Sequence, residues 1–194
     1  GPAAAQQVTG FLGAGKTTLV NHILSNSSGA GGDVRPHHGL RAAVFVNEFG
    51  SVDVDGALIR SRLDEDRVIT LTNGCVCCEV NEDLAKQLSQ LLRASRHALD
   101  IVIIETSGVC DPEPVIQTLQ QIEDIDQAHL DAVVCVVDAE TLGDPEFGAS
   151  ADAERQVAHA DVLLLNKVDR FPGGPDGDAA RAAEGRLLGR CGAG

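Results

Sequence analysis

Residues 10–17, GFLGAGKT, are the stretch that decides the fold. They match the pattern G-x-x-x-x-G-K-[ST], whose backbone amides close around phosphate oxygens, and a β-carbon at the glycines would block that approach. Lys16 supplies a positive charge to the β- and γ-phosphates, the Thr17 hydroxyl can bind Mg²⁺, and the following helix adds the positive end of its dipole. We predict a phosphate-binding loop formed by Gly10, Gly13, Ala14, Gly15, Lys16, Thr17 and Thr18.

The sequence around this motif alternates apolar runs with helical periodicity. That alternation is typical of an α/β protein with a largely parallel sheet. It weakens the alternative that the motif is a chance glycine-rich turn before a helix. The expected strands are a weak one just before Thr9 and the runs 42–46, 67–72, 101–105, 132–137 and 161–165.

Three helices are expected from the periodicity and the capping residues. The first covers 17–24, and the second follows residue 80, with Asn81 as its cap. The third begins at Pro112, a residue suited to a first helical turn. Residues 25–39 are predicted to form a polar, glycine-rich loop, and the tail from Phe171 a loop with a short Ala-rich helix. The apolar faces of the second and third helices comprise Leu84, Leu88, Leu91 and Leu92, and Val115, Ile116, Leu119 and Ile122.

A second motif, NKVD at 166–169, follows directly after an apolar run and indicates which nucleotide base is bound. Asn166, Lys167 and Asp169 fit the N-K-x-D pattern of GTPases. The Asp169 carboxylate can accept hydrogen bonds from N1–H and the exocyclic amine of guanine, which adenine does not offer, and buried donors left unpaired are costly. An ordinary strand-end turn is the alternative, since Asn and Asp suit turns.

Two further acidic strand ends are expected to face the same crevice, because open α/β sheets bind ligands at the carboxyl ends of their strands. Glu105 ends the run IVIIE and would hold Mg²⁺ or its water, while Gly108 offers a backbone amide near the γ-phosphate. NEFG at 47–50 places Glu48 at another strand end. Asp138 is the weaker case, since a solvated or capping carboxylate fits it equally well.

Residues 71–80, LTNGCVCCEV, place Cys75, Cys77 and Cys78 within four residues. Thiolates are soft ligands suited to Zn²⁺ and Cu(I), and zinc favours four tetrahedral ligands. Three cysteines leave one position for Glu48, a substrate or water, and such an incomplete site can exchange its ion. Redox chemistry or structural thiols are the alternatives. Of the other cysteines, Cys110 is expected as a small buried thiol, Cys135 in the core and Cys191 on a loose tail.

Composition excludes several classes of protein. With 194 residues, the chain is expected to form a single domain. Its net charge of −14 is the wrong sign for binding nucleic acid, and no apolar run is long enough for a membrane span. Six cysteines in an acidic chain of this size favour a reducing compartment over a secreted disulfide scaffold.

The motifs taken together resemble the CobW-type metallochaperone GTPases, relatives of the UreG and HypB proteins. The matching stretches run from Thr9 to Asp169 and are TGFLGAGKTTLVNHIL, NEFG, NGCVCC, ETSGVCDPEP, VVDA and NKVD. The resemblance implies a three-layer P-loop NTPase domain of the SIMIBI type that binds GTP or GDP, Mg²⁺ and a transition metal, most often zinc, with Co²⁺ also accommodated. Ser51 stands where family members often have an acidic residue, and the family's C-terminal domain is expected to be absent.

We therefore expect a GTPase that couples hydrolysis to metal transfer. Lys16 and Glu105 would serve catalysis, Thr17 would hold Mg²⁺, and Cys75, Cys77, Cys78 and Glu48 would hold the transferred metal. The expected partners are GTP and a metal-requiring client protein, in the cytoplasm or in the stroma or matrix of an organelle; a homodimer is left open. The alternatives are a non-enzymatic, GTP-responsive metal sensor or store, and a thiol redox switch.

Overall fold

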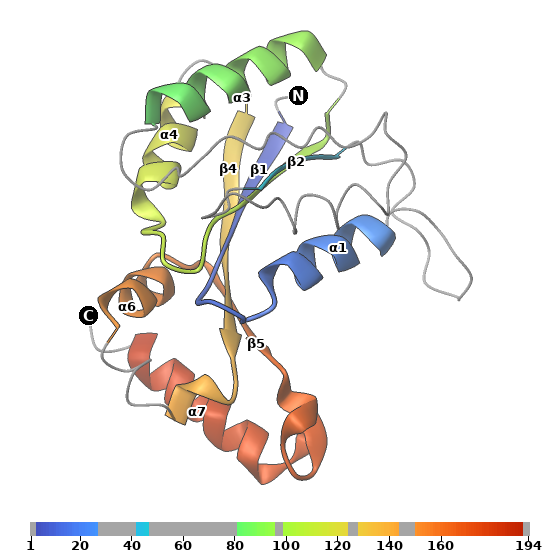
Figure 1. Cartoon of the computed structure of the whole chain (residues 1–194), viewed down its shortest axis with the longest axis vertical. Coiled ribbons are helices and arrows are strands. Elements are labelled where there is room, and N and C mark those ends of the chain that lie inside the picture. Colours follow the sequence, from blue (N-terminus) through green and yellow to red (C-terminus); the bar gives the residue numbers. More distant parts are fainter. Residues whose placement is uncertain are drawn as a thin grey trace.

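Five strands pair in parallel in the computed structural model, which describes residues 3–26, 42–46, 81–95, 99–123, 128–143 and 150–191. Their order across the sheet is β2-β3-β1-β4-β5, so the first strand lies at the centre (Figure 1). This parallel α/β architecture confirms the predicted fold class. The strands are β1 (Ala3–Thr9), β2 (Ala42–Val46), β3 (Ile101–Glu105), β4 (Ala128–Asp138) and β5 (Val162–Asn166).

Helices cover both faces of this sheet and make three layers (Figure 1). One face packs against α1 (Lys16–Asn26), and the other against α3 (Asn81–Ser95) and α4 (Glu113–Glu123), with α6 (Ala151–Ala158) and α7 (Asp178–Cys191) beyond them. The described chain also contains three short 3-10 turns, η1 (Thr141–Gly143), η2 (Val168–Arg170) and η3 (Gly174–Asp176).

Burial on both faces explains the apolar strands, because a parallel sheet covered by helices has no solvated side. In β3, Ile103 packs toward α1, whereas Val102 and Ile104 pack toward α3 and α4. The helices meet these residues with the apolar faces predicted from their periodicity. The buried helical residues on this side of the sheet are Leu84, Leu88, Leu91, Val115, Leu119 and Ile122, with Leu92 packed at the edge.

The strand predictions agree with the structure wherever it describes the chain. The runs 42–46 and 101–105 are β2 and β3, the run 161–165 is β5 shifted by one residue, and the run 132–137 lies inside a longer β4. The predicted strand at 67–72 lies outside the described residues. Cys135 is buried in the core on β4, as expected.

The prediction for the tail was wrong. Instead of a short helix in a loose segment, α7 has 14 residues and Cys191 is its last one. Ala183 and Leu187 anchor this helix against β4 and α6, which accounts for its length despite a weak apolar pattern. The predicted loop at 25–39 also starts too early, because α1 continues through Asn26.

The central strand carries an amide where apolar packing would be expected. Gln7 is fully buried in β1, and neither its Nε2 nor its Oε1 has a hydrogen-bond partner. Burying an amide without partners costs about 1–3 kcal/mol in proteins. The neighbouring Gln6, on the opposite face, instead donates to Asp131 Oδ2 at 2.9 Å. β1 is therefore held at the centre by pairing with β3 and β4 in spite of Gln7.

Replacing Gln7 by leucine, a residue of similar volume, should stabilise the domain because it removes the uncompensated amide. We expect the free energy of unfolding in urea to rise by about 1–3 kcal/mol. Gln6→Leu is the matched control and should bring no gain, since it removes a made hydrogen bond. Equal effects of the two substitutions would contradict this account of β1.

Among the helices of the described ranges, none combines the length and the apolar character needed to cross a membrane.

Candidate nucleotide site

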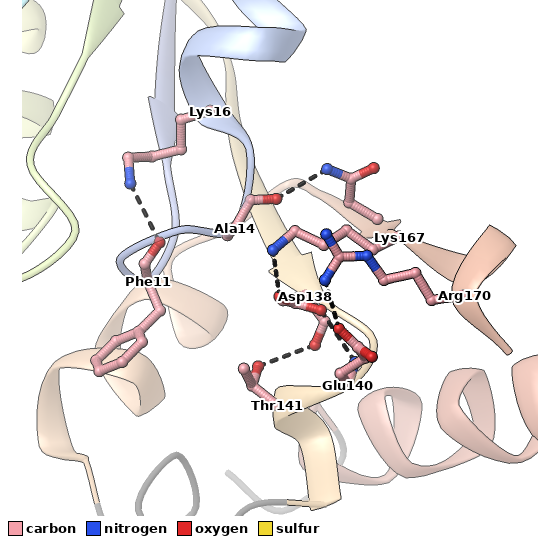
Figure 2. Close-up of polar contacts among 9 residues, drawn as sticks. Phe11, Ala14, Lys16, Asp138, Glu140, Thr141, Lys167 and Arg170 are labelled. Carbon is pink, nitrogen blue, oxygen red and sulfur yellow. Dashed lines mark hydrogen bonds and ion pairs between the residues drawn. The ribbon is translucent and has the colours of Figure 1, made fainter. Parts of the chain in front are cut away.

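The loop between β1 and α1 closes around its own lysine. Lys16 is the first residue of α1, and its Nζ donates to the carbonyl oxygen of Gly10 at 2.9 Å. It also donates to the carbonyl oxygen of Phe11 at 3.2 Å, a bond that Figure 2 shows. Only 8% of Lys16 is exposed. These bonds hold an ammonium group inside the loop, beside the backbone amides at the start of α1. The result is a concentrated positive site that suits a phosphate group.

The two residues predicted to hold Mg²⁺ meet directly. The Thr17 hydroxyl donates to Glu105 Oε1 at 2.5 Å. Their proximity follows from the sheet, because β1 and β3 are neighbours and Val8 lies opposite Glu105. Glu105 is 4% exposed, so this carboxylate is buried at the end of its strand. A hydroxyl and a carboxylate oxygen are ligands that a hard cation such as Mg²⁺ prefers.

Asn166 of the NKVD motif supports the phosphate-binding loop directly. Its Nδ2 donates to the Ala14 carbonyl at 2.8 Å. Gly15 adopts φ +103°, and a β-carbon there would lie 2.3 Å from Asn166 Nδ2. The two motifs therefore form one unit, in which glycine is required at position 15 both by its backbone and by its neighbour.

Lys167 and Asp138 form a partly buried ion pair next to this unit. Lys167 has a left-handed backbone, with φ 61°, and its Nζ donates to Asp138 Oδ2 at 2.6 Å (Figure 2). The other oxygen, Oδ1, accepts from the Glu140 amide at 3.0 Å. Asp138 is thus a capping carboxylate, one of the two alternatives weighed above, and it also positions Lys167. The contact follows from the register of the sheet, since Asp138 pairs with Asn166 across β4 and β5.

Asp169, the predicted guanine ligand, lies in the turn η2 and is exposed. The following Arg170 donates to Glu140 Oε2 at 2.7 Å, and this hydrogen bond and charge raise the pKa of Arg170 above its ordinary value. η2 is therefore tied to the end of β4 through Arg170 as well as through Lys167. The Asp169 side chain stays exposed at the surface.

The segment after Glu105 is wedged between the loop and α6. A β-carbon on Gly108 would lie 2.5 Å from the Leu12 nitrogen, so only glycine permits this approach. On the other side, Gln156 of α6 is 1% exposed, and its Nε2 donates to the carbonyls of Gly108 and Cys110, both at 3.1 Å. Sequence reasoning missed Gln156, because one glutamine in an amphipathic helix gives no signal of burial.

Several predicted metal ligands cannot be placed. Glu48, Cys75, Cys77 and Cys78 lie outside the described residues. Cys110 is 3% exposed, so its expected burial is confirmed, but it is disulfide-bonded and the expectation of a free thiol was wrong.

The parallel fold, the closed lysine loop and the paired Thr17 and Glu105 define a nucleotide-binding domain of the P-loop class. The family described as "CobW/HypB/UreG, nucleotide-binding domain" matches residues 4–186. The chain belongs to this family, which confirms the resemblance noted in the sequence.

Curated relatives support this assignment. The chain is 41% identical over 172 residues to the zinc chaperone YjiA of Escherichia coli, covering 87% of this chain and 50% of that protein. It is 34% identical over 197 residues to zinc-regulated GTPase metalloprotein activator 1 of Dictyostelium discoideum, covering 84% and 39% respectively. The chain thus spans half or less of the length of these two relatives.

Solved structures agree on the fold. Zn(II)-bound YjiA GTPase from E. coli superposes with a TM-score of 0.60 at 31% identity, covering 97% of this chain and 54% of that one. The signal recognition particle receptor FtsY of Elizabethkingia anophelis gives 0.54 at 18% identity, with 97% and 54% covered, and shares the fold alone.

Gln156→Leu should loosen the segment after Glu105, because two buried carbonyl groups lose their donor. We expect a loss of about 2–4 kcal/mol in the free energy of unfolding and faster hydrogen exchange at residues 106–112. Gln117→Leu, on the exposed side of α4, is the control and should change stability by no more than about 0.5 kcal/mol. Unchanged exchange in the Gln156 variant would show that the segment is held by other contacts.

Proposed function

We propose that the protein is a GTP-hydrolysing metallochaperone that binds zinc, or a similar transition metal, and transfers it to a client protein. The observation that carries the nucleotide half is the contact of Thr17 with Glu105 beside the lysine-filled loop. The metal half rests on the C-x-C-C sequence and on relatives named as zinc chaperones. We treat the chain as one GTPase domain, with the cytoplasm, or the stroma or matrix of an organelle, as the compartment.

The phosphates of GTP would occupy the loop. Lys16 would exchange its bonds to Gly10 and Phe11 for the β- and γ-phosphate oxygens, and the amides of residues 13–18 would complete the cradle. Mg²⁺ would take the place of the hydrogen bond between Thr17 and Glu105 and neutralise charge on the transferring phosphoryl group. The Gly108 amide would lie near the γ-phosphate. Positioning and charge stabilisation account for most of the catalysis in such sites.

Guanine would be selected by Asp169. Asn166 and Lys167 are already fixed by Ala14 and Asp138, so the turn that carries Asp169 is held in place before the nucleotide binds. A preorganised carboxylate loses little entropy on binding and rejects a base that lacks the two matching donors.

Asp169→Ala should remove this discrimination. We expect GTP affinity to fall by roughly 100-fold or more, with ATP affinity unchanged, because the two guanine donors lose their acceptor. Fluorescent nucleotide titration measures both values. Asp176→Ala, an exposed aspartate in the nearby η3, is the control and should bind GTP as the wild type does. If the Asp169→Ala variant still prefers GTP over ATP, guanine is recognised by residues other than Asp169.

The transferred metal would bind at Cys75, Cys77 and Cys78, with Glu48 as the fourth ligand. Thiolates suit zinc, and Glu48 follows β2 by two residues in the sequence, while β2 is the neighbour of β3 in the sheet. A change in nucleotide state would therefore alter the geometry of the metal site. A client would receive the ion when that geometry opens.

Zinc affinity should depend on the nucleotide. We expect Zn²⁺ titrations of the nucleotide-free, GDP-bound and GTP-bound protein to differ at least about fivefold between the GDP and GTP forms. Cys77→Ser should lower the affinity in every state, whereas Cys135→Ala, a change at a cysteine buried in β4, should not. Equal Zn²⁺ affinity in all three nucleotide states would contradict the proposed coupling between metal and nucleotide. GTP hydrolysis that is unaffected by metal would favour the non-enzymatic sensor or store.

A thiol redox switch is the second candidate, and the disulfide at Cys110 is the observation that favours it. Reversible oxidation would then control the segment between Glu105 and α4. Thiol titration of the wild type and of Cys110→Ala, with and without reductant, distinguishes this function from metal transfer. A nucleotide affinity that changes with reduction in the wild type alone would support the switch.

A further inference from the structure

Three potential metal ligands outside the nucleotide loop converge at the surface. Asp111 precedes α4, Glu113 is the first residue of that helix, and His159 follows the end of α6. One ligand atom from each lies within 4.8 Å of the other two. They come from segments more than 40 residues apart that the fold brings side by side (Figure 1).

This arrangement is held by the backbone as well as by side chains. Asp111 Oδ1 accepts from the Glu113 amide at 3.0 Å, which fixes the aspartate at the start of α4. The His159 amide bonds back to the carbonyls of Arg155 and Val157, which fixes the histidine at the end of α6. Gln156 joins α6 to the same loop through the Cys110 carbonyl. The three ligands therefore project from anchored positions.

We propose that Asp111, Glu113 and His159 form a second metal site, for a divalent transition cation of the zinc class. One imidazole and two carboxylates suit zinc and its neighbours, and three protein ligands leave a position for water or an exchanging ligand. Ligand atoms around such an ion are about 3–3.5 Å apart, since each is about 2.1 Å from the metal. Modest rotation of these surface side chains closes the observed separation.

The other polar contacts of Glu113 and Asp111 determine which of their oxygen atoms a metal ion can reach. Gln117 Nε2 donates to Glu113 Oε1 at 3.1 Å, so a cation would be bound through the second carboxylate oxygen. Arg155 donates to Asp111 Oδ2 at 3.3 Å and opposes a cation there. Arg155 is 53% exposed and has a second acidic neighbour, Asp152, at 3.7 Å on its own helix. The guanidinium can thus turn to Asp152 when the metal binds to Asp111.

The site goes beyond the proposed cysteine site and does not depend on it. It lies one residue from Cys110, in the segment that begins at Glu105 and is clamped by Gln156. A metal bound there would crosslink α4 to α6 and stiffen that segment. This would give the domain a thiol-free binding position for a metal ion at its surface.

The test uses the full chain with Cys75→Ser, Cys77→Ser and Cys78→Ser, so that the proposed cysteine site cannot contribute. Co²⁺ and Zn²⁺ are titrated without nucleotide by calorimetry, and Co²⁺ also by visible absorption. We expect one equivalent to bind, without the charge-transfer absorption of a cobalt thiolate. His159→Ala and Glu113→Gln should each weaken binding at least about tenfold. His129→Ala, in β4, is the matched control and should not.

A further variant should change the Co²⁺ affinity in the opposite direction. Arg155→Gln removes the competing guanidinium and should therefore tighten Co²⁺ binding several-fold. Absence of binding in the chain with these three serine substitutions would overturn the proposal, as would an unchanged affinity in His159→Ala. If Ca²⁺ binds as tightly as Co²⁺, the three residues have no preference for a transition metal and act only as an acidic surface patch, which would also overturn the proposal. Failure of the nucleotide-dependent zinc affinity proposed above would leave these results untouched, so the two proposals fail separately.

Discussion

The hydrogen bond from Thr17 to Glu105 joins the first turn of α1 to the end of β3, and the site is built around it. It requires β1 and β3 to be neighbours in register, with Val8 opposite Glu105. The bond is partly buried, with Glu105 withdrawn from water, and a hydrogen bond is electrostatically stronger in the protein interior than in water. The central place of β1, which keeps a buried unpaired Gln7, shows how strongly pairing and helix cover outweigh one unfavourable side chain.

From Glu105 the chain runs through a segment with little freedom. Gly108 touches the loop at Leu12, Gln156 holds two carbonyls, and α4 begins directly afterwards. A nucleotide that draws Gly108 toward its γ-phosphate would therefore act on α6 and on the start of α4. This is a physical route from the nucleotide to the disulfide at Cys110 and to the cluster of Asp111, Glu113 and His159.

The local motifs were predictable because their chemistry imposes spacing. The positions of loop 10–17, Glu105 and the NKVD motif at strand ends follow from local spacing, while their roles toward phosphate, Mg²⁺ and guanine stay predictions. The missed features depend on long-range contacts: Gln156 becomes buried only when α6 meets the segment after Glu105, and Asp138 meets Lys167 only across β4 and β5. α7 was underestimated because its alanines give a weak periodic pattern, whereas packing of Ala183 and Leu187 stabilises it.

The most direct test of the account is the Mg²⁺ dependence of GTP hydrolysis in wild type and Glu105→Gln, measured as phosphate release under single-turnover conditions. The glutamine keeps the size of the side chain but removes the charge that would hold the ion. The account predicts retained GTP binding, a much weaker dependence on Mg²⁺ and hydrolysis slowed by roughly 100-fold or more. Hydrolysis at the wild-type rate, with unchanged Mg²⁺ dependence, would contradict it.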